Sequence, residues 1–269
     1  MKVIGVGDNV VDKYMHKGMM YPGGNALNFS VYAKQLGVEA AYLGTFGNDR
    51  AASHIMETLE EIGVDLSHCR QHEGPNAYAG VDLVEGDRVF IGGNSGVQKE
   101  HPLVLTEEDL GYIRTFAMAH TSVYSRIESE LPKLKETGIL LSYDFSADYH
   151  EDMLKQVCPY VDVSLLSCGH LSEEETKTLL LQVCSFGSRL AIGTMGSKGA
   201  MVYDGQEFYQ QAPHFVKPVD TLGAGDSFFT AFILQYLQGK ELPDSLEAGA
   251  KFAAETCLVD GAFGYGISF

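Results

Sequence analysis

The stretch DTLGAGDSFFTAF (residues 220–232) places three small residues, Gly223, Ala224 and Gly225, directly before the carboxylate of Asp226 and an apolar run. Small residues let a backbone turn sharply and approach another group closely. The first N–H groups of a helix lack intrahelical partners, so they form a seat for an anion such as phosphate. A carboxylate beside that seat repels the anion, unless its role is to accept a proton. The stretch therefore predicts phosphoryl transfer, with Asp226 as general base and the surrounding N–H groups as anion hole. The alternative is a helix that one of its carboxylates merely caps.

Two further stretches place glycine where a ligand could approach the backbone. YPGGNALN contains Gly23 and Gly24 before a helical pattern, and TMGSKG contains Gly196 and Gly199 directly after an apolar run. Taken alone, the first is compatible with a tight turn before a helix and the second with a turn into a hairpin.

The elements that must position these residues alternate between strands and helices. Apolar runs predict buried strands, and helical periodicity with capping residues such as Thr106 and Ser172 predicts helices. We expect strands at 3–8, 39–47, 122–125, 139–145, 161–167 and 189–194, and a hairpin at 200–212. We expect helices at 23–37, 49–63, 129–138, 172–184 and 243–258, and one more directly after the DTLGAGD stretch (220–226). This order predicts a parallel βαβ arrangement.

Residues 67–96 interrupt the alternation. Two extended runs flank Glu85-Gly86-Asp87, a hairpin signature that predicts a small lid outside the main sheet, with roughly residues 12–22 also contributing. Arg88 lies in this lid and either contacts substrate or only pairs and packs. We expect a single domain over residues 1–269, with an exposed lid edge through which two copies could form a homodimer.

Composition narrows the class of protein. The chain has 269 residues, 45% of them hydrophobic, which predicts a packed globular protein. Its net charge of −17 argues against nucleic acid as a partner. Five scattered cysteines without a C-x-x-C pair predict neither a disulfide framework nor a zinc site. The chain has no signal-peptide pattern and no run near the roughly 18 apolar residues of a membrane span. We therefore expect a cytoplasmic protein with no membrane partner.

The motifs together resemble one family. DTLGAGDSFFTAF resembles the C-terminal signature D-T-x-G-A-G-D of the PfkB, or ribokinase-like, carbohydrate kinases, and YPGGNALNFSVYAKQLG resembles the family's N-terminal motif. The resemblance covers nearly the whole chain. It implies a ribokinase-like α/β fold, a three-layer αβα sandwich with a mostly parallel central sheet and a small β lid. It also implies phosphorylation of a small-molecule sugar by ATP with Mg²⁺.

The resemblance also implies roles for single residues. It makes Asp226 the catalytic base, with Gly223, Ala224 and Gly225 at the anion hole. It assigns sugar binding to Asp12, Gly23, Gly24 and Asn28, and nucleotide binding to Thr194, Gly196, Gly199 and Gly225. Asp220 occupies the place of a ligand for a monovalent cation such as K⁺. The adenine would lie near Ala253 and Gly261–Ala262.

One motif departs from the family. Where the family carries N-x-x-E after a strand, this chain reads SCGH, from Ser167 to His170. Magnesium would then depend on water and ATP oxygens, with Glu173 or Glu174 nearby, although helix capping and solvation explain these glutamates as well. Asp144, at a strand end, either touches substrate or metal-bound water or is a buried, hydrogen-bonded Asp.

Several details resemble the fructosamine branch, the fructoselysine 6-kinases: the opening GDNVVDKY, the phrase GDRVF, the strand YDFSAD and the missing N-x-x-E. This implies a ketose joined to an amino acid through C1, phosphorylated at its C6 hydroxyl. Three alternatives stay open: another sugar or nucleoside kinase of the family (ribokinase-, fructokinase- or adenosine-kinase-like), a non-catalytic sugar-binding protein on the same fold, and a Rossmann oxidoreductase. GVGDN lacks the third glycine that the last of these requires.

Overall fold

The computed structural model describes residues 1–84 and 87–269, so Glu85 and Gly86 of the expected hairpin lie outside it. Its central sheet is mostly parallel, and its described strands follow the order β13-β12-β11-β10-β9-β8-β1-β4-β5. Their bounds are β1 (Lys2–Gly7), β4 (Glu39–Phe46), β5 (Arg70–Gln71), β8 (Met118–Ser122), β9 (Leu140–Asp144), β10 (Val163–Ser167), β11 (Leu190–Thr194), β12 (Ala200–Tyr203) and β13 (Phe208–Gln211). Among the described strands of this sheet, β12 runs antiparallel to both of its neighbours, β11 and β13, and the other pairs are parallel.

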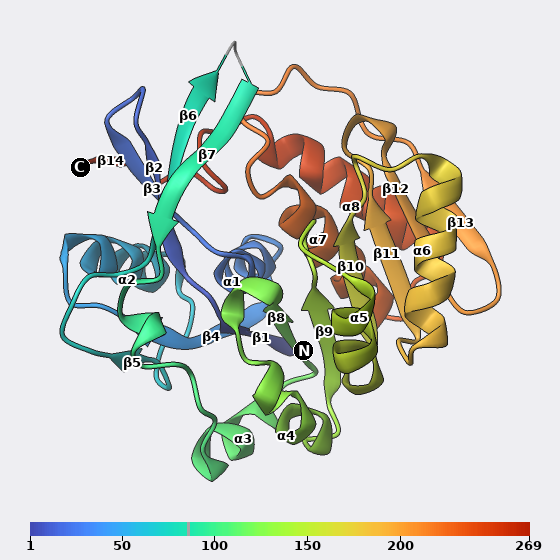
Figure 1. Cartoon of the computed structure of the whole chain (residues 1–269), viewed down its shortest axis with the longest axis horizontal. Coiled ribbons are helices and arrows are strands. Elements are labelled where there is room, and N and C mark those ends of the chain that lie inside the picture. The colour runs from blue at the N-terminus through green and yellow to red at the C-terminus, as the bar shows by residue number, and fades with distance from the viewer. Residues whose placement is uncertain (85–86) are drawn as a thin grey trace.

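Helices cover both faces of this sheet (Figure 1). One face packs against α3 (Glu107–Ile113), α4 (Leu131–Glu136), α5 (Glu151–Val157) and α6 (Glu173–Ser185). The other packs against α1 (Asn25–Gln35), α2 (Arg50–Ile62), α7 (Ala224–Leu237) and α8 (Leu242–Thr256). A strand that is buried on both faces has a continuous apolar sequence, and this pattern predicted most of the strands. The expected three-layer αβα sandwich is confirmed.

A second, smaller sheet forms the lid. It contains β2 (Val10–Tyr14), β3 (Met19–Gly23), β6 (Tyr78–Val84), β7 (Asp87–Asn94) and β14 (Ile267–Ser268), in the order β14-β3-β2-β6-β7. The long β6–β7 hairpin projects from the body of the molecule beside β2 and β3 (Figure 1). The expected small β lid is therefore confirmed, but the expected segment 67–96 is too long, because Arg70–Gln71 form β5 of the central sheet. The contribution of β14, from the C-terminal end of the chain, was not expected, because a two-residue strand has no pattern of its own.

The expected strand at 122–125 is wrong. The strand is β8, Met118–Ser122, and Val123–Ser125 form a 3₁₀ helix instead. The Ser122 hydroxyl accepts a hydrogen bond from the N–H of Tyr124 at 3.1 Å, so the chain turns where the strand was expected to begin. The strand itself escaped notice because its sequence, MAHTS, interrupts the apolar run with His120 and Thr121.

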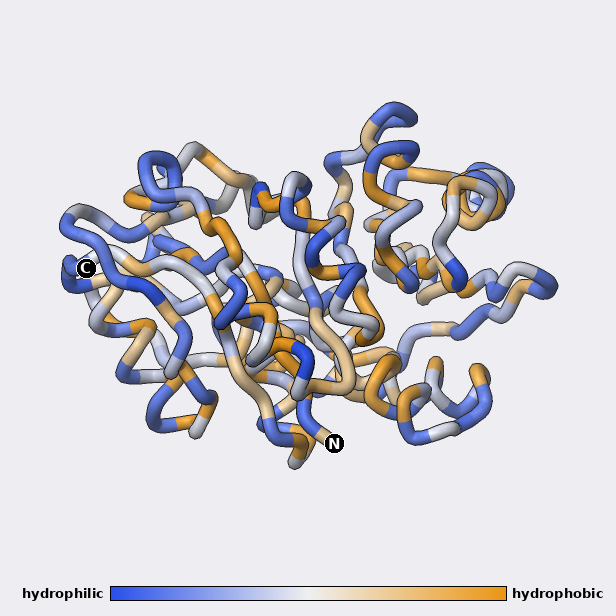
Figure 2. The backbone as a smooth tube through the Cα atoms, turned by 90° about the horizontal axis from the view of Figure 1, so that it is seen from below, coloured by the Kyte–Doolittle hydropathy of each residue, from blue (hydrophilic) through white to orange (hydrophobic). Residues whose placement is uncertain are grey.

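Two helices begin where the sequence predicts them to begin. Thr106 and Ser172 both form capping boxes, with Asp109 and Glu175 respectively, so these predicted helix starts are confirmed. Figure 2 shows hydrophilic residues on several loops at the periphery. No helix among the described residues is long and apolar enough to cross a membrane.

Candidate active site

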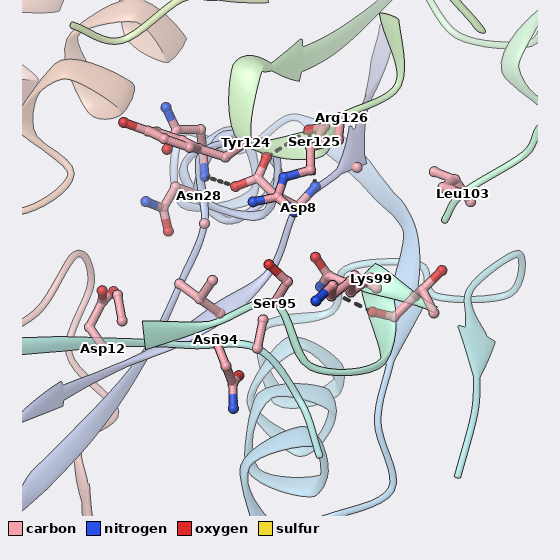
Figure 3. A pocket seen from close by; sticks show the side chains of 18 of the residues that line it. Asp8, Asp12, Asn28, Asn94, Ser95, Lys99, Leu103, Tyr124, Ser125 and Arg126 are labelled. Atoms are coloured by element: carbon pink, nitrogen blue, oxygen red, sulfur yellow. Dashed lines mark hydrogen bonds between the residues drawn. The ribbon is translucent and has the colours of Figure 1, made fainter. Parts of the chain in front are cut away.

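A cavity of about 600 Å³ lies between the lid sheet and the carboxyl ends of β1 and β4. In parallel sheets, ligands bind outside the carboxyl ends of the strands, so the cavity has the position of a binding site. Its polar lining includes Asp8, Asp12, Asn25, Asn28, Asn94, Ser95, Gln98, Lys99, Arg126 and Asp226. Figure 3 shows how most of these side chains surround it. Four residues expected to carry sugar binding and catalysis, Asp12, Gly24, Asn28 and Asp226, therefore line one cavity.

Asp226 lies on the first turn of α7, and its side chain is almost fully buried. Its Oδ2 accepts a hydrogen bond of 2.7 Å from Nδ2 of Asn28. Burial, and after it the nearby charge of Asp144, raises the pKa of the Asp226 carboxyl well above its usual range. A carboxylate that binds protons more strongly than usual is the better general base, which is the chemistry expected at this position.

Asn28 has an unsatisfied polar atom. Its Oδ1 is buried and has no hydrogen-bond partner in the part of the chain that the structure describes. A buried acceptor without a partner is unfavourable, so it marks a place where a ligand hydroxyl would be stabilised. Because the same amide donates to Asp226, a hydroxyl donating to Asn28 would lie close to the candidate base.

Asn25, one turn before Asn28, connects α1 to a second buried carboxylate. Its Nδ2 donates a hydrogen bond of 2.6 Å to Oδ2 of Asp144, at the end of β9. Asp144 also accepts from the N–H of Ser146 at 2.7 Å. Burial raises the pKa of the Asp144 carboxyl to about 6, in spite of these hydrogen bonds. Asp144 does not line the cavity, which favours a role behind the site over direct contact with substrate.

Asp8 fixes the start of α1, which begins just after Gly24. The carboxylate of Asp8 accepts hydrogen bonds from the N–H groups of Asn25 (2.7 Å) and Ala26 (3.3 Å). It also accepts from the hydroxyls of Ser122 and Ser125, both at 2.8 Å. An acidic side chain at a helix N-terminus satisfies orphan N–H groups and the dipole, so Asp8 holds α1 in register with β8.

Asp12 lies on β2 with 4% of its surface exposed, and it lines the cavity. A Cβ placed on Gly23 would lie 2.3 Å from Oδ2 of Asp12, so a larger residue would require this carboxylate to move. Gly24 has φ +116, and a Cβ there would lie 2.8 Å from Cα of Asn9. The glycine pair is therefore needed for close packing of the protein's own chain around Asp12.

The start of α7 has a tightly packed glycine and an open one. Gly223 has φ +73, and a Cβ there would lie 2.3 Å from the hydroxyl of Tyr32. At Gly225 a Cβ would meet nothing within 4 Å. The first hydrogen bond of the helix runs from the N–H of Ser227 to the Gly223 carbonyl, at 2.8 Å. The N–H groups of Gly225 and Asp226 precede it, and the open space at Gly225 leaves room for a phosphate group.

The residues expected to bind nucleotide do not line this cavity. Thr194 ends β11, and Gly196 and Gly199 flank the turn into β12. A Cβ on Gly199 would lie 1.9 Å from the carbonyl oxygen of Gln211, so hairpin packing by itself accounts for this glycine. Gly196 has φ +57 and open space around it, which leaves room for a ligand.

The two expected metal ligands also lie apart from the cavity. Glu173, at the start of α6, pairs with Lys177 at 2.8 Å. Asp220 accepts hydrogen bonds from the N–H groups of Leu222 and Gly261, both at 3.0 Å, and from the hydroxyl of Tyr14 on the lid. Among the described residues, no group of three or more His, Cys, Asp or Glu side chains could hold a metal ion.

One predicted lid residue has no described side chain, and three residues at the cavity were not predicted from the sequence. Arg88 belongs to β7, but its side chain lies outside the described residues. Lys99 and Arg126 line the cavity without belonging to any motif that the sequence revealed. Asp8 could have been found, because it directly follows the first strand in the stretch GDNVVD. Its serine partners come from a segment that was expected to be a strand.

The sequence matches the family described as pfkB family carbohydrate kinase over residues 1–264. It is 42% identical to fructosamine kinase FrlD of Bacillus subtilis (strain 168) over 272 residues, which cover 100% of this chain and 95% of that protein. It is 32% identical to fructoselysine 6-kinase of Escherichia coli (strain K12) over 259 residues, or 96% of this chain and 98% of that protein.

Solved structures show the same fold. Arabidopsis thaliana ribokinase, complexed with ribose and ATP, superposes with a TM-score of 0.84 at 20% identity, covering 98% of this chain and 94% of that chain. An Escherichia coli structure in complex with ATP and Mg²⁺ superposes with a TM-score of 0.80 at 22% identity, covering 97% and 94%. The family match spans nearly the full length, and the two relatives exceed 30% identity. The chain therefore belongs to the pfkB family of carbohydrate kinases.

Proposed function

We propose that this kinase transfers the γ-phosphoryl group of ATP to the C6 hydroxyl of a fructosamine, with fructoselysine as the preferred substrate. The observation that carries the proposal is the pair Asp226 and Asn28, 2.7 Å apart in one cavity with Asp12. Its support from relatives is the 42% identity to a fructosamine kinase and the 32% identity to a fructoselysine 6-kinase.

The sugar would bind against Asp12, Gly24 and Asn28. A carboxylate such as Asp12 accepts hydrogen bonds from two hydroxyls at once, which suits a polyol. Oδ1 of Asn28, buried without a partner among the described residues, would accept a third hydroxyl hydrogen bond. Gly23 supports this arrangement indirectly, because it leaves room for the Asp12 carboxylate. The Arg88 side chain stays a predicted contact from the lid.

Transfer would proceed by direct attack. Asp226 takes the proton of the C6 hydroxyl, whose oxygen forms a bond to the γ-phosphorus while the bond from that phosphorus to the departing ADP oxygen breaks. The N–H groups at Gly225 and Asp226 stabilise the charge on the moving phosphoryl group, whereas the Ala224 N–H donates to the Thr221 carbonyl at 3.3 Å. Lid closure would exclude water, which otherwise competes as the acceptor. Thr194, Gly196 and Gly199 would contact the nucleotide.

The proposal involves two metal ions, Mg²⁺ bound through ATP and K⁺ at Asp220. The described residues contain no ready cluster of ligands, so Mg²⁺ would arrive on the phosphates of ATP, where it neutralises charge. Glu173 already pairs with Lys177, which supports its role as a helix-start residue over that of a ligand. Activation by K⁺ at Asp220 stays a prediction, since the hydrogen bonds of this carboxylate equally support a structural role.

A coupled assay of ADP release with Mg-ATP tests the proposal. The panel contains fructoselysine, other fructosamines, fructose, ribose, fructose 6-phosphate and adenosine, with Asp226→Asn as the control. We expect the highest kcat/KM for fructoselysine. A higher value for a substrate that is not a fructosamine would keep the family and discard the proposed specificity. Formation of a homodimer through the lid is a separate prediction, which light scattering of the intact protein tests.

A further inference from the structure

The end of the cavity away from Asp12 is lined by cationic and apolar side chains. Lys99, Leu103 and Arg126 all line the cavity. Figure 3 shows them toward the side opposite Asp12, with Asp8 between. The cavity volume of about 600 Å³ lies in the range of sites for ligands larger than a single sugar. The cavity thus has one acidic end, near Asp12, which would receive the sugar, and one end with cationic and apolar side chains.

The two cations at this end, Lys99 and Arg126, have no anionic partner among the side chains that the structure describes. Within residues 1–82 and 90–269, whose side chains the structure describes, neither the Lys99 ammonium nor the Arg126 guanidinium forms an ion pair or hydrogen bond. The chain has 36 acidic residues against 19 basic ones, so carboxylate partners are abundant elsewhere. Two basic side chains that share one cavity without such a partner leave their charge available to a ligand.

The backbone that presents Arg126 is fixed in an unusual conformation. Arg126 has φ 54 and ψ 41, in the left-handed region that non-glycine residues seldom adopt. The turn before it is secured by Ser122 and Ser125, whose hydroxyls each donate to Asp8 at 2.8 Å. Because Asp8 also holds the start of α1, the position of Arg126 is tied to the sugar-binding helix. Such non-glycine conformations concentrate at functional sites.

Apolar side chains line the remainder of this end. Leu103 is 7% exposed, and Pro102 precedes it along the cavity wall. Together they offer a surface for an aliphatic chain, which would gain free energy on leaving water.

We propose that Arg126 and Lys99 bind the carboxylate of the amino acid that the ketose carries, while its aliphatic part packs against Pro102 and Leu103. This inference rests on the proposed function and adds the residues that recognise the amino acid. In a fructosamine, C6 and the C1 amine lie at opposite ends of the sugar. With C6 at Asp226, the amino acid extends away from the base. The planar guanidinium matches a carboxylate bidentately, and the ammonium adds a point charge.

The test compares two substrates that differ in one group. Fructoselysine carries the carboxylate, whereas fructosyl-cadaverine is the same molecule without it. We expect Arg126→Gln to lower kcat/KM for fructoselysine on the order of 10-fold, a typical loss for one charge-assisted hydrogen bond, and to leave fructosyl-cadaverine within about 3-fold. Lys99→Gln acts in the same direction, and Arg126→Lys restores part of the loss. Arg114→Gln, an exposed arginine outside the cavity, is the matched control and changes neither value.

Three results would overturn the inference, and they distinguish a failure of carboxylate recognition from a failure of the proposed function. If the wild-type enzyme phosphorylates both fructosamines with equal kcat/KM, or if Arg126→Gln lowers both equally, carboxylate recognition is wrong while the fructosamine kinase activity stands. If the wild-type enzyme phosphorylates neither fructosamine but turns over another sugar of the panel, the proposed function itself is wrong and this inference falls with it.

Discussion

Nδ2 of Asn28 donates a hydrogen bond of 2.7 Å to Oδ2 of Asp226, across 198 residues of sequence. The bond joins the first turn of α1 to the first turn of α7, two helices on the same face of the central sheet. Burial, and after it the charge of Asp144, raises the pKa of the Asp226 carboxyl, whereas this hydrogen bond lowers it. The balance of these effects sets how readily the candidate base accepts a proton.

The first prediction concerns the base directly. Asp226→Asn keeps the size and the contact with Asn28 but removes the proton acceptor. We expect kcat to fall on the order of 10²–10⁴-fold, the usual contribution of a positioned base. The measurement is ADP release with the best sugar substrate. Asp152→Asn, an exposed residue on α5, is the matched control and should retain full activity. A variant at position 226 with nearly full activity would exclude the base assignment.

The same substitution should stabilise the protein. The folded state raises the pKa of Asp226, so its contribution to stability is full below the usual pKa of about 3.8 and is lost as pH rises through the folded value. We therefore expect Asp226→Asn to increase the free energy of unfolding relative to wild type at about pH 8, and to have little effect near pH 3. Urea denaturation at both values measures this difference. An unchanged or lower stability at the higher pH would contradict the raised pKa.

Asp144 should control the pH dependence of activity without contacting substrate. Its charge raises the pKa of Asp226, so Asp144→Asn, which can still accept a hydrogen bond from Asn25, should lower that pKa. A lower pKa keeps the base ionised in more acidic solution. We expect the acid limb of the kcat/KM profile to move to lower pH, with the KM for sugar changed by less than about 3-fold. A limb that stays in place, or moves to higher pH, would rule out this electrostatic coupling.

The sequence alone predicted those parts of the site that depend on neighbouring residues. The glycines and carboxylate from Gly223 to Asp226 can be interpreted locally, because a helix start and its small residues are contiguous. The alternation of apolar strands and helices likewise predicted the layers of the fold. The pairing of Asn28 with Asp226 was not derivable from spacing, because it joins the ends of two helices that only the tertiary fold brings together.

The role of Asp8 shows most clearly what the sequence alone could not predict. This carboxylate is bound by Ser122 and Ser125, which are 114 and 117 residues away. The stretch around these serines was expected to be a strand, so their hydroxyls were assigned no function. Arg126 shares that segment, and its left-handed backbone has no local sequence signal, because such a conformation usually selects glycine.

The last prediction separates two reasons for glycine at the start of α7. At Gly223, φ is +73 and a Cβ would lie 2.3 Å from the hydroxyl of Tyr32, so Gly223→Ala should lower the free energy of unfolding by about 1–3 kcal/mol. At Gly225 a Cβ meets nothing within 4 Å, and the residue is helical. Gly225→Ala should therefore leave stability unchanged or raise it by up to about 1 kcal/mol.

Gly225→Ala should lower activity even though it does not lower stability. If the open space at this residue receives the phosphoryl group, the added methyl displaces it, and kcat/KM for ATP should fall by about 10²-fold. Gly111→Ala on α3 is the matched control, since a Cβ there also meets nothing within 4 Å and α3 packs on the opposite face of the sheet from α7. Urea denaturation and ADP release are measured on all three variants. Full activity in Gly225→Ala would mean that the space above this helix start is not the phosphate seat.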